Sequence, residues 1–268
     1  MKIILYTFFL LLMICCKDKN PEVKLVEEKI PSPEEVLRDY IKNPKADDRT
    51  CKEDIEKAEK DLEKYQKIYV FISCFGCKSK PYENEIKEYS VKEKVEIMYD
   101  PYSCVFTEGQ TRGCYKATVD SRMEEIYGKD FRKNIEQAAE KLMIQKIKDQ
   151  GKILSIYDLE ENDKPHFIKE DNLIKDGYIP TIKTGFPLKE DRDHHLFMDI
   201  SFIIEKNGRI TNLKNENWVN EFKENEKYKN NLESIAKQEI LTNYSNWKPG
   251  KYKNTIARVR NSFRVNFE

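Results

Sequence analysis

Two cysteines stand at the end of a predicted strand, where they could carry out thiol–disulfide exchange. Residues 67–73 are rich in β-branched and aromatic side chains and predict a buried strand that runs directly into Cys74 and Cys77. We expect a short helix to follow, and a helix N-terminus stabilises the thiolate that attacks disulfides. In this interpretation Cys74 is the nucleophile and Cys77 is the resolving thiol.

This order of strand, cysteines and helix is similar to that of thioredoxin-like oxidoreductases. Residues 179–181, Ile-Pro-Thr, resemble the proline loop that faces the cysteines in those enzymes. Three features differ from that pattern. The spacing from Cys77 to Pro180 is much longer than in a compact thioredoxin unit, Pro81 comes one residue early, and no apolar strand follows Thr181. The resemblance therefore predicts an oxidoreductase only as an alternative function.

The first residues of the chain have a different character from the rest. Residues 3–14 form an almost continuous apolar run that ends at Cys15-Cys16. As a helix this run spans about 18 Å, well below the roughly 30 Å of a hydrocarbon core, so it predicts a signal peptide and not a membrane span. The site resembles the lipobox of bacterial lipoproteins, which implies acylation of Cys16; an ordinary secretory signal is the alternative. Either processing predicts a periplasm-facing protein of the cell envelope.

An oxidising envelope favours disulfides among the cysteines that remain after processing. Their number is odd, so one is free, buried or paired to another chain. We favour a structural disulfide network over thiol chemistry, and a zinc site is a third option that secreted chains use less often. The set comprises Cys51, Cys74, Cys77, Cys104 and Cys114.

Composition excludes several other classes of function. The chain has 48 basic and 48 acidic residues, so no global charge argues for nucleic acid. Its three histidines, His166, His194 and His195, lie in charged segments and predict surface positions rather than a metal site. No Gly-rich phosphate loop and no Ser/His/Asp arrangement is present. We therefore expect no cofactor and no metal.

The chain divides into two predicted domains behind a tether. Residues 17–31 are charged and rich in proline, typical of a flexible linker. Residues 32–151 predict a small Cys-containing α/β domain, in which Ser32 and Thr50 each begin a capping pattern. Residues 152–185 show little periodicity and are interpreted as an interdomain segment.

The last part of the chain predicts a three-stranded antiparallel sheet covered by a helix, and hence an α+β fold overall. A strand over residues 195–205 alternates strictly, and Asn207-Gly208 is a strong hairpin signal before a strand over 209–214. Helical spacing begins near Val219. The final strand, 254–267, follows a turn at Trp247, Pro249 and Gly250.

Residues 186–268 resemble the C-terminal domain of TonB-type energy transducers. The resemblance rests on residues 201–212, on the Asn-Trp-Lys-Pro-Gly-Lys of 246–251, and on the Val-Arg-Asn-Ser-Phe-Arg-Val-Asn-Phe of 259–267. It implies a strand edge that pairs with an extended segment of an outer-membrane transport protein. The chain has neither the membrane-spanning helix nor the Pro-rich spacer of those transducers, so the resemblance supports binding more than transport.

Basic side chains mark the predicted binding edge. Arg258, Arg260 and Arg264 are expected to point outward from the final strand, either to meet an acidic partner or to protect an edge strand from aggregation. Together these features predict a non-enzymatic envelope lipoprotein that binds an envelope protein or an extended peptide. The alternative is an envelope thiol-disulfide oxidoreductase.

Overall fold

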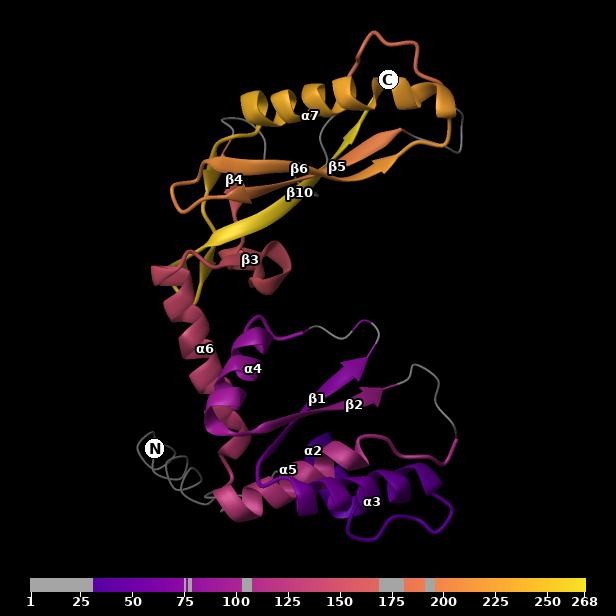
Figure 1. Ribbon diagram of the computed structural model, residues 1–268, viewed down its shortest axis with the longest axis vertical. Coiled ribbons are helices and arrows are strands. Elements are labelled where there is room, and N and C mark those ends of the chain that lie inside the picture. Colours follow the sequence, from indigo (N-terminus) through magenta and orange to yellow (C-terminus); the bar gives the residue numbers. More distant parts are fainter. Residues whose placement is uncertain (1–30, 75, 77–78, 103–107, 169–180, 191–195) are drawn as a thin grey trace, which may run out of the picture.

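The computed structural model describes residues 31–74, 76, 79–102, 108–168, 181–190 and 196–268. The predicted signal peptide and tether, with Cys16, lie outside these ranges, as do Cys77, Cys104 and Pro180. Within them the chain is a mixed α+β protein with several small sheets. No helix of this part is long and apolar enough to cross a bilayer. Figure 1 shows two units that are joined through the long helix α6.

The N-terminal unit is a parallel pair of strands with helices on both faces (Figure 1). The strands pair in register from Ile68 opposite Glu96 to Cys74 opposite Tyr102. The capping box at Ser32 is confirmed, whereas Asp48 and not Thr50 caps the next helix. The elements are α2 (Pro33–Tyr40), α3 (Arg49–Lys64), β1 (Ile68–Cys74), α4 (Glu83–Glu93), β2 (Glu96–Tyr102), α5 (Cys114–Tyr127) and α6 (Phe131–Asp149).

Both faces of the first four residues of β1 are buried, which explains the continuous apolar run of this strand. Ile68 and Val70 pack against α3 and α5 in one cluster. Tyr69 and Phe71 point to the opposite face and pack against α4 and α6 in another. Burial ends before the strand does, because Ile72 is exposed.

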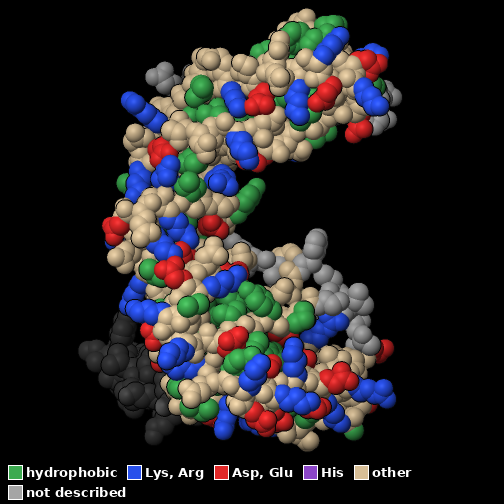
Figure 2. All heavy atoms as spheres, viewed as in Figure 1, with side chains coloured by type: hydrophobic (Ala, Val, Ile, Leu, Met, Phe, Trp, Pro, Cys, Tyr) green, Lys and Arg blue, Asp and Glu red, His purple; other side chains and the backbone are tan. Residues whose placement is uncertain are grey.

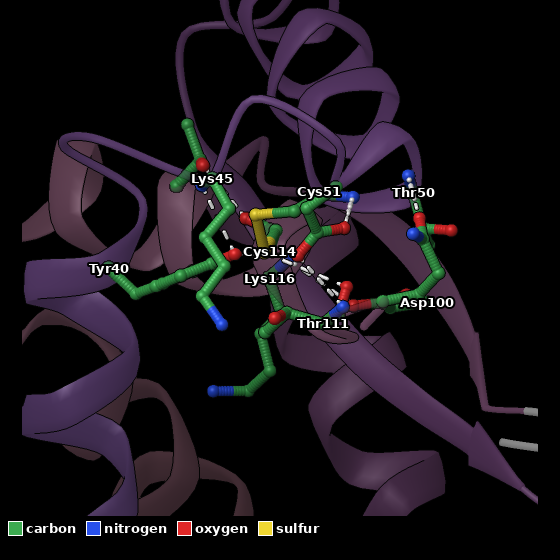
Figure 3. The surroundings of a disulfide bond; sticks show 11 residues. Tyr40, Lys45, Thr50, Cys51, Asp100, Thr111, Cys114 and Lys116 are labelled. Atoms are coloured by element: carbon green, nitrogen blue, oxygen red, sulfur yellow. Dashed lines mark hydrogen bonds between the residues drawn. A yellow bond between two sulfur atoms is a disulfide. The ribbon is translucent and has the colours of Figure 1, made fainter. Parts of the chain in front are cut away.

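A disulfide between Cys51 and Cys114 joins the starts of α3 and α5 (Figure 3). Beside it, the fully buried carboxylate of Asp48 accepts hydrogen bonds from the Cys51 amide at 3.1 Å, the Tyr40 hydroxyl at 2.8 Å and the Thr111 amide at 2.9 Å. Burial alone would raise the pKa of Asp48, but these bonds outweigh it and hold the pKa below its ordinary value. The disulfide and this carboxylate together fix the N-terminal ends of the two helices.

The C-terminal unit is a four-stranded sheet with the order β3-β10-β5-β6. The three strands that the sequence predicts form its antiparallel part. The fourth, β3, comes from the segment interpreted as interdomain and runs parallel to β10. The elements are β3 (Ile153–Ser155), β4 (His166–Phe167), β5 (Phe197–Ile204), β6 (Ile210–Val219), α7 (Lys229–Asn243), β7 (Trp247–Lys248), β8 (Lys251–Tyr252), β9 (Thr255–Ile256) and β10 (Arg258–Asn266), with short 3-10 helices η1 (Ile156–Asp158), η2 (Glu161–Asp163) and η3 (Lys223–Tyr228).

Two predicted turns shape this unit, and one predicted helix starts later than expected. Gly208 has a φ of 80°, and a Cβ there would lie 2.0 Å from the carbonyl oxygen of Trp247, so the Asn207-Gly208 turn packs directly against the later Trp turn. The carbonyl of Gly250, next to Pro249, accepts the Ala257 amide at 3.0 Å. Val219 ends β6 instead of starting a helix, because it pairs with Phe197 on β5.

α7 covers one face of the sheet and encloses the main apolar core (Figure 1). Trp247 is buried there and donates its indole N–H to the carbonyl of Tyr244 at 2.7 Å. The buried residues of this core are Phe167, Leu196, Met198, Ile200, Phe202, Ile204, Ile210, Leu232, Ala236, Ile240, Tyr244, Trp247, Phe263, Val265 and Phe267.

α6 belongs to the cores of both units. Ile135 and Ala139 pack into the N-terminal unit, whereas Met143 and Ile147 pack against residues of β3 and β10. Figure 2 shows a deep notch between the units on the side away from α6. The helix therefore connects the two units along the side opposite this notch.

Candidate functional site

Cys74 lies at the carboxyl end of β1, in the wall of a cavity of about 440 Å³. It is disulfide-bonded, and because Cys51 and Cys114 are joined to each other, its partner is not among the cysteines of the described ranges. The second cysteine of the motif, Cys77, lies outside those ranges. The cavity is lined by Tyr69, Phe71, Ile72, Ser73, Cys74, Ser79, Lys80, Glu83, Tyr99 and Arg132.

The helix expected after the cysteines begins later than the motif predicts. α4 starts at Glu83, beyond Pro81, and its N-cap residue Tyr82 makes no side-chain capping bond. Because the effect of a helix dipole falls off within the first turn, α4 does not stabilise a thiolate at Cys74 as directly as the sequence suggested.

Charged groups in that wall are paired with one another. Arg132, from the first turn of α6, donates to the carbonyl of Val70 at 3.0 Å and lies 4.1 Å from the ring centre of Tyr69. Tyr69 donates its hydroxyl to Glu136 at 2.8 Å, and burial raises the pKa of Tyr69 well above its ordinary value. Burial alone would raise the pKa of Glu136, but hydrogen bonds from Lys80 and Tyr69 lower it. These pairs leave the wall close to charge balance.

A smaller cavity of about 220 Å³ lies at the carboxyl end of β2, and it contains two carboxylates that the sequence did not single out. Asp54 and Asp100 both line it, and burial raises the pKa of each. Asp100 accepts the backbone N–H of Lys116 at 3.3 Å. No motif marks these residues, because only the packing of α3 against the strand end buries them.

The three arginines predicted to bind a partner differ in their surroundings. Arg258 forms a two-pronged ion pair with Glu205, at 2.7 and 2.8 Å, and its hydrogen bonds lower the pKa of Glu205. Arg264 pairs with Asp199 at 2.9 and 3.2 Å, directly across from it on β5. Arg260 is exposed. Two of the three thus also hold strands of their own sheet together.

The two edges of the C-terminal sheet differ in how far they are open to pairing with a further strand. The outer edge of β10 is paired at both ends, by β3 over Arg258–Arg260 and by a bridge from Ile182 to Phe267. β6 is the outermost strand on the other side, and no strand in the described ranges pairs with its outer side. Its register with β5 shifts twice, and Asn212 adopts a left-handed φ of 54°.

The described residues hold no group of three or more His, Cys, Asp and Glu side chains that could bind a metal ion. His166 is exposed on β4, and His194 and His195 lie outside these ranges. Comparison with known proteins found no match: no family model, no curated protein and no solved structure is significantly similar to the chain.

Proposed function

We propose that this chain is a cell-envelope lipoprotein whose C-terminal unit binds an extended segment of another envelope protein by strand addition. The outer side of β6, which no described strand covers, is the observation that carries the proposal. An open strand edge offers backbone donors and acceptors to a partner, and neighbouring side chains choose among partners. The resemblance of residues 186–268 to TonB C-terminal domains supports the same mode of binding.

The pairing of the sheet edges supports one place where we expect such a partner to pair. The edge of β10, which carries the three arginines, already has its own chain at both ends. On β6 the longest stretch in regular register is Asn217–Val219, opposite Phe197–Asp199. A partner segment pairs there beside the half-buried Trp218, and the two bulges protect the rest of the edge from aggregation.

Site-specific cross-linking in cells tests this proposal. A photoreactive side chain at Asn217 is expected to capture one segment of an envelope protein, and a matched probe at the exposed Ser262 on β10 is the control. A synthetic peptide of the captured segment should then bind the purified chain, and Trp218→Ala should weaken that binding by about tenfold. Capture at Ser262 but not at Asn217, or equal affinity of the variant, would contradict docking at β6.

A second function is favoured by the position of Cys74. Cys74 is disulfide-bonded and lies at the end of a strand, in the wall of a cavity, where a thiol can reach its sulfur. The Cys51–Cys114 disulfide is fully buried and cannot be reached in this way. We infer thiol–disulfide exchange at Cys74. Brief treatment with reduced glutathione followed by alkylation and mass spectrometry should label Cys74 and leave Cys51 and Cys114 unlabelled. Equal labelling of all three would remove this candidate.

A further inference from the structure

We propose that the outer edge of β1 is a docking site for an extended, uncharged polypeptide segment that carries a cysteine, bound through the main chain of Ile72. The inference deepens the thiol–disulfide exchange inferred at Cys74 and rests on it for its chemistry. The substrate of that exchange is such a cysteine-containing segment, and the cavity orients it along β1.

The register of the strands shows which backbone groups of β1 face away from β2. The amide of Glu96 donates to the carbonyl of Lys67, so odd-numbered residues of β1 bond to β2 and even-numbered ones point outward. At two of the outward positions one backbone group bonds to a side chain: the Ile68 amide donates to Met123 Sδ at 3.3 Å, and the Val70 carbonyl accepts from Arg132 at 3.0 Å.

Ile72 is the next outward position, and it lies inside the cavity. Its amide and carbonyl make no hydrogen bond to another residue of the described ranges, and 43% of its surface is exposed. The side chains of Arg132 and Met123 cover the outer edge of β1 as far as Val70. Among the described residues, the uncovered part of this edge therefore begins at Ile72. A backbone N–H and C=O that point the same way from one residue fit the main chain of an extended peptide.

The walls of the cavity indicate the chemical character of that peptide. Tyr99 is 47% exposed and stacks on Phe71 with 5.7 Å between ring centres, which provides an aromatic surface beside Ile72. The cations that line the wall have carboxylate partners: Lys80 lies 2.5 Å from Glu136, and Arg132 lies 3.2 Å from Glu136 and 3.4 Å from Asp120. A wall without excess charge complements uncharged side chains on the bound segment.

The spacing along the strand places a substrate thiol at Cys74. Two residues of strand advance by about 6.6 Å, so a cysteine two positions from the residue paired with Ile72 lies beside Cys74. Its thiolate attacks the sulfur of Cys74 and forms a mixed disulfide. The bond from Cys74 to its own partner cysteine breaks, and that sulfur leaves as a thiolate and takes up the proton that the substrate thiol lost.

The substitution Ile72→Pro tests peptide docking separately from thiol–disulfide exchange at Cys74. Ile72→Pro removes the outward N–H without removing a bond to β2, and proline is tolerated at an edge position of this kind. Ile72→Val keeps the N–H and is the matched control. The probes are a fluorescent eight-residue peptide of alternating Val and Thr with one central cysteine, the same peptide with serine instead, and reduced glutathione.

The serine peptide should bind the oxidised full-length protein, measured by fluorescence anisotropy, and Ile72→Pro should weaken that binding by about tenfold while Ile72→Val leaves it unchanged. The rate at which the cysteine peptide forms a mixed disulfide should fall about tenfold in Ile72→Pro, and the rate with glutathione should stay within about twofold. Circular dichroism should show that all variants keep the wild-type fold.

Equal affinity of the serine peptide for Ile72→Pro and Ile72→Val would overturn docking at this edge. Reaction of Cys74 with both glutathione and the cysteine peptide, with the peptide rate equal in Ile72→Pro and Ile72→Val, would leave the exchange at Cys74 standing and remove the docking site. Binding of the serine peptide that depends on Ile72, without any mixed disulfide with the cysteine peptide, would leave the docking site standing and remove the exchange at Cys74. The docking site and the exchange are therefore contradicted by different measurements.

Discussion

The hydroxyl of Tyr252, on the hairpin β8–β9 of the C-terminal unit, donates a 2.6 Å hydrogen bond to Glu140 in the middle of α6. The ammonium of Lys253, at the tip of the same hairpin, lies 2.6 Å from the other oxygen of that carboxylate. Further along α6, Lys146 and the nearby Lys152 share the fully buried carboxylate of Glu85 on α4. These polar contacts lie beside apolar packing on α6, so the two units form one connected structure.

Removing the hydroxyl of Tyr252 tests this connection. Tyr252→Phe should lower the free energy of unfolding by about 1 kcal/mol, because Glu140 loses one of its two partners while its charge stays paired with Lys253. The measurement is urea unfolding of the full chain, followed by circular dichroism. Tyr157→Phe, at a tyrosine that is 76% exposed on η1, is the control and should change nothing. Equal effects of the two substitutions would show that the Tyr252 bond does not contribute to stability.

Asp48 makes the stability of the N-terminal unit depend on pH. The folded pKa of Asp48 lies below the unfolded one, so its stabilising effect is present above the unfolded pKa, about 3.9, and is lost as the pH falls through the folded pKa. Asp48→Asn should cost about 1–3 kcal/mol at pH 7 and less at low pH, because an amide cannot accept all the bonds that the carboxylate accepts. Urea unfolding of the wild type and of Asp48→Asn, from pH 7 down through the pKa of Asp48, measures this difference in the free energy of unfolding.

Asp47→Asn is the matched control for this prediction, since Asp47 is the exposed neighbour of Asp48. It should leave both the stability at pH 7 and the acid dependence as in the wild type. A constant cost of Asp48→Asn at all pH values would mean that titration of Asp48 is not the cause.

The buried disulfide should be a major source of stability. Replacing Cys51 and Cys114 together by alanine opens a loop with a sequence separation of 63 residues, and a loss of about 2–4 kcal/mol is expected. The denaturant midpoint of the double variant measures the loss. Cys74→Ala, at the half-exposed end of β1, should lower the midpoint much less, and the opposite order would contradict this assignment of structural and reactive cysteines.

The arginines of β10 should separate into structural and exposed positions. Arg258→Ala leaves Glu205 without its two-pronged partner and should cost about 1–2 kcal/mol. Arg260→Ala, at an exposed side chain, should stay within about 0.5 kcal/mol. Thermal unfolding of the two variants compares them directly. Similar costs at both positions would show that the ion pair on this face contributes little.

Acylation of the N-terminus is tested at Cys16. In cells fed a labelled fatty acid, the wild-type chain should carry the label and sediment with membranes, and Cys16→Ser should lose both properties. Cys15→Ser should keep the label, because Cys16 is the residue that we expect to be acylated. A wild-type chain without the label would mean that it is processed as an ordinary secreted protein, and a label that survives in Cys16→Ser would mean that another residue is acylated.

The sequence alone determined the features whose causes lie within a few residues. The capping box at Ser32 forms because its partners are three positions apart. The Asn207-Gly208 turn likewise depends on local conformation. The alternation expected of β5 holds only in its first half, because all residues from Ile200 to Ile204 are buried. These signals were sufficient for the α+β class and for the antiparallel strands of the C-terminal sheet.

Tertiary structure decided what depends on segments that are distant in the chain. β3 and β4 are too short to carry a periodic signal, and they become strands only because β10 and β7 offer them open edges. The pairing of Cys51 with Cys114 could not be chosen from five cysteines, and the partners of Arg258 and Arg264 depend on the register of β10 against β5. The backbone groups of Ile72, which bond to no other residue in the part of the chain that the structure describes, likewise depend on where Arg132 and Met123 pack.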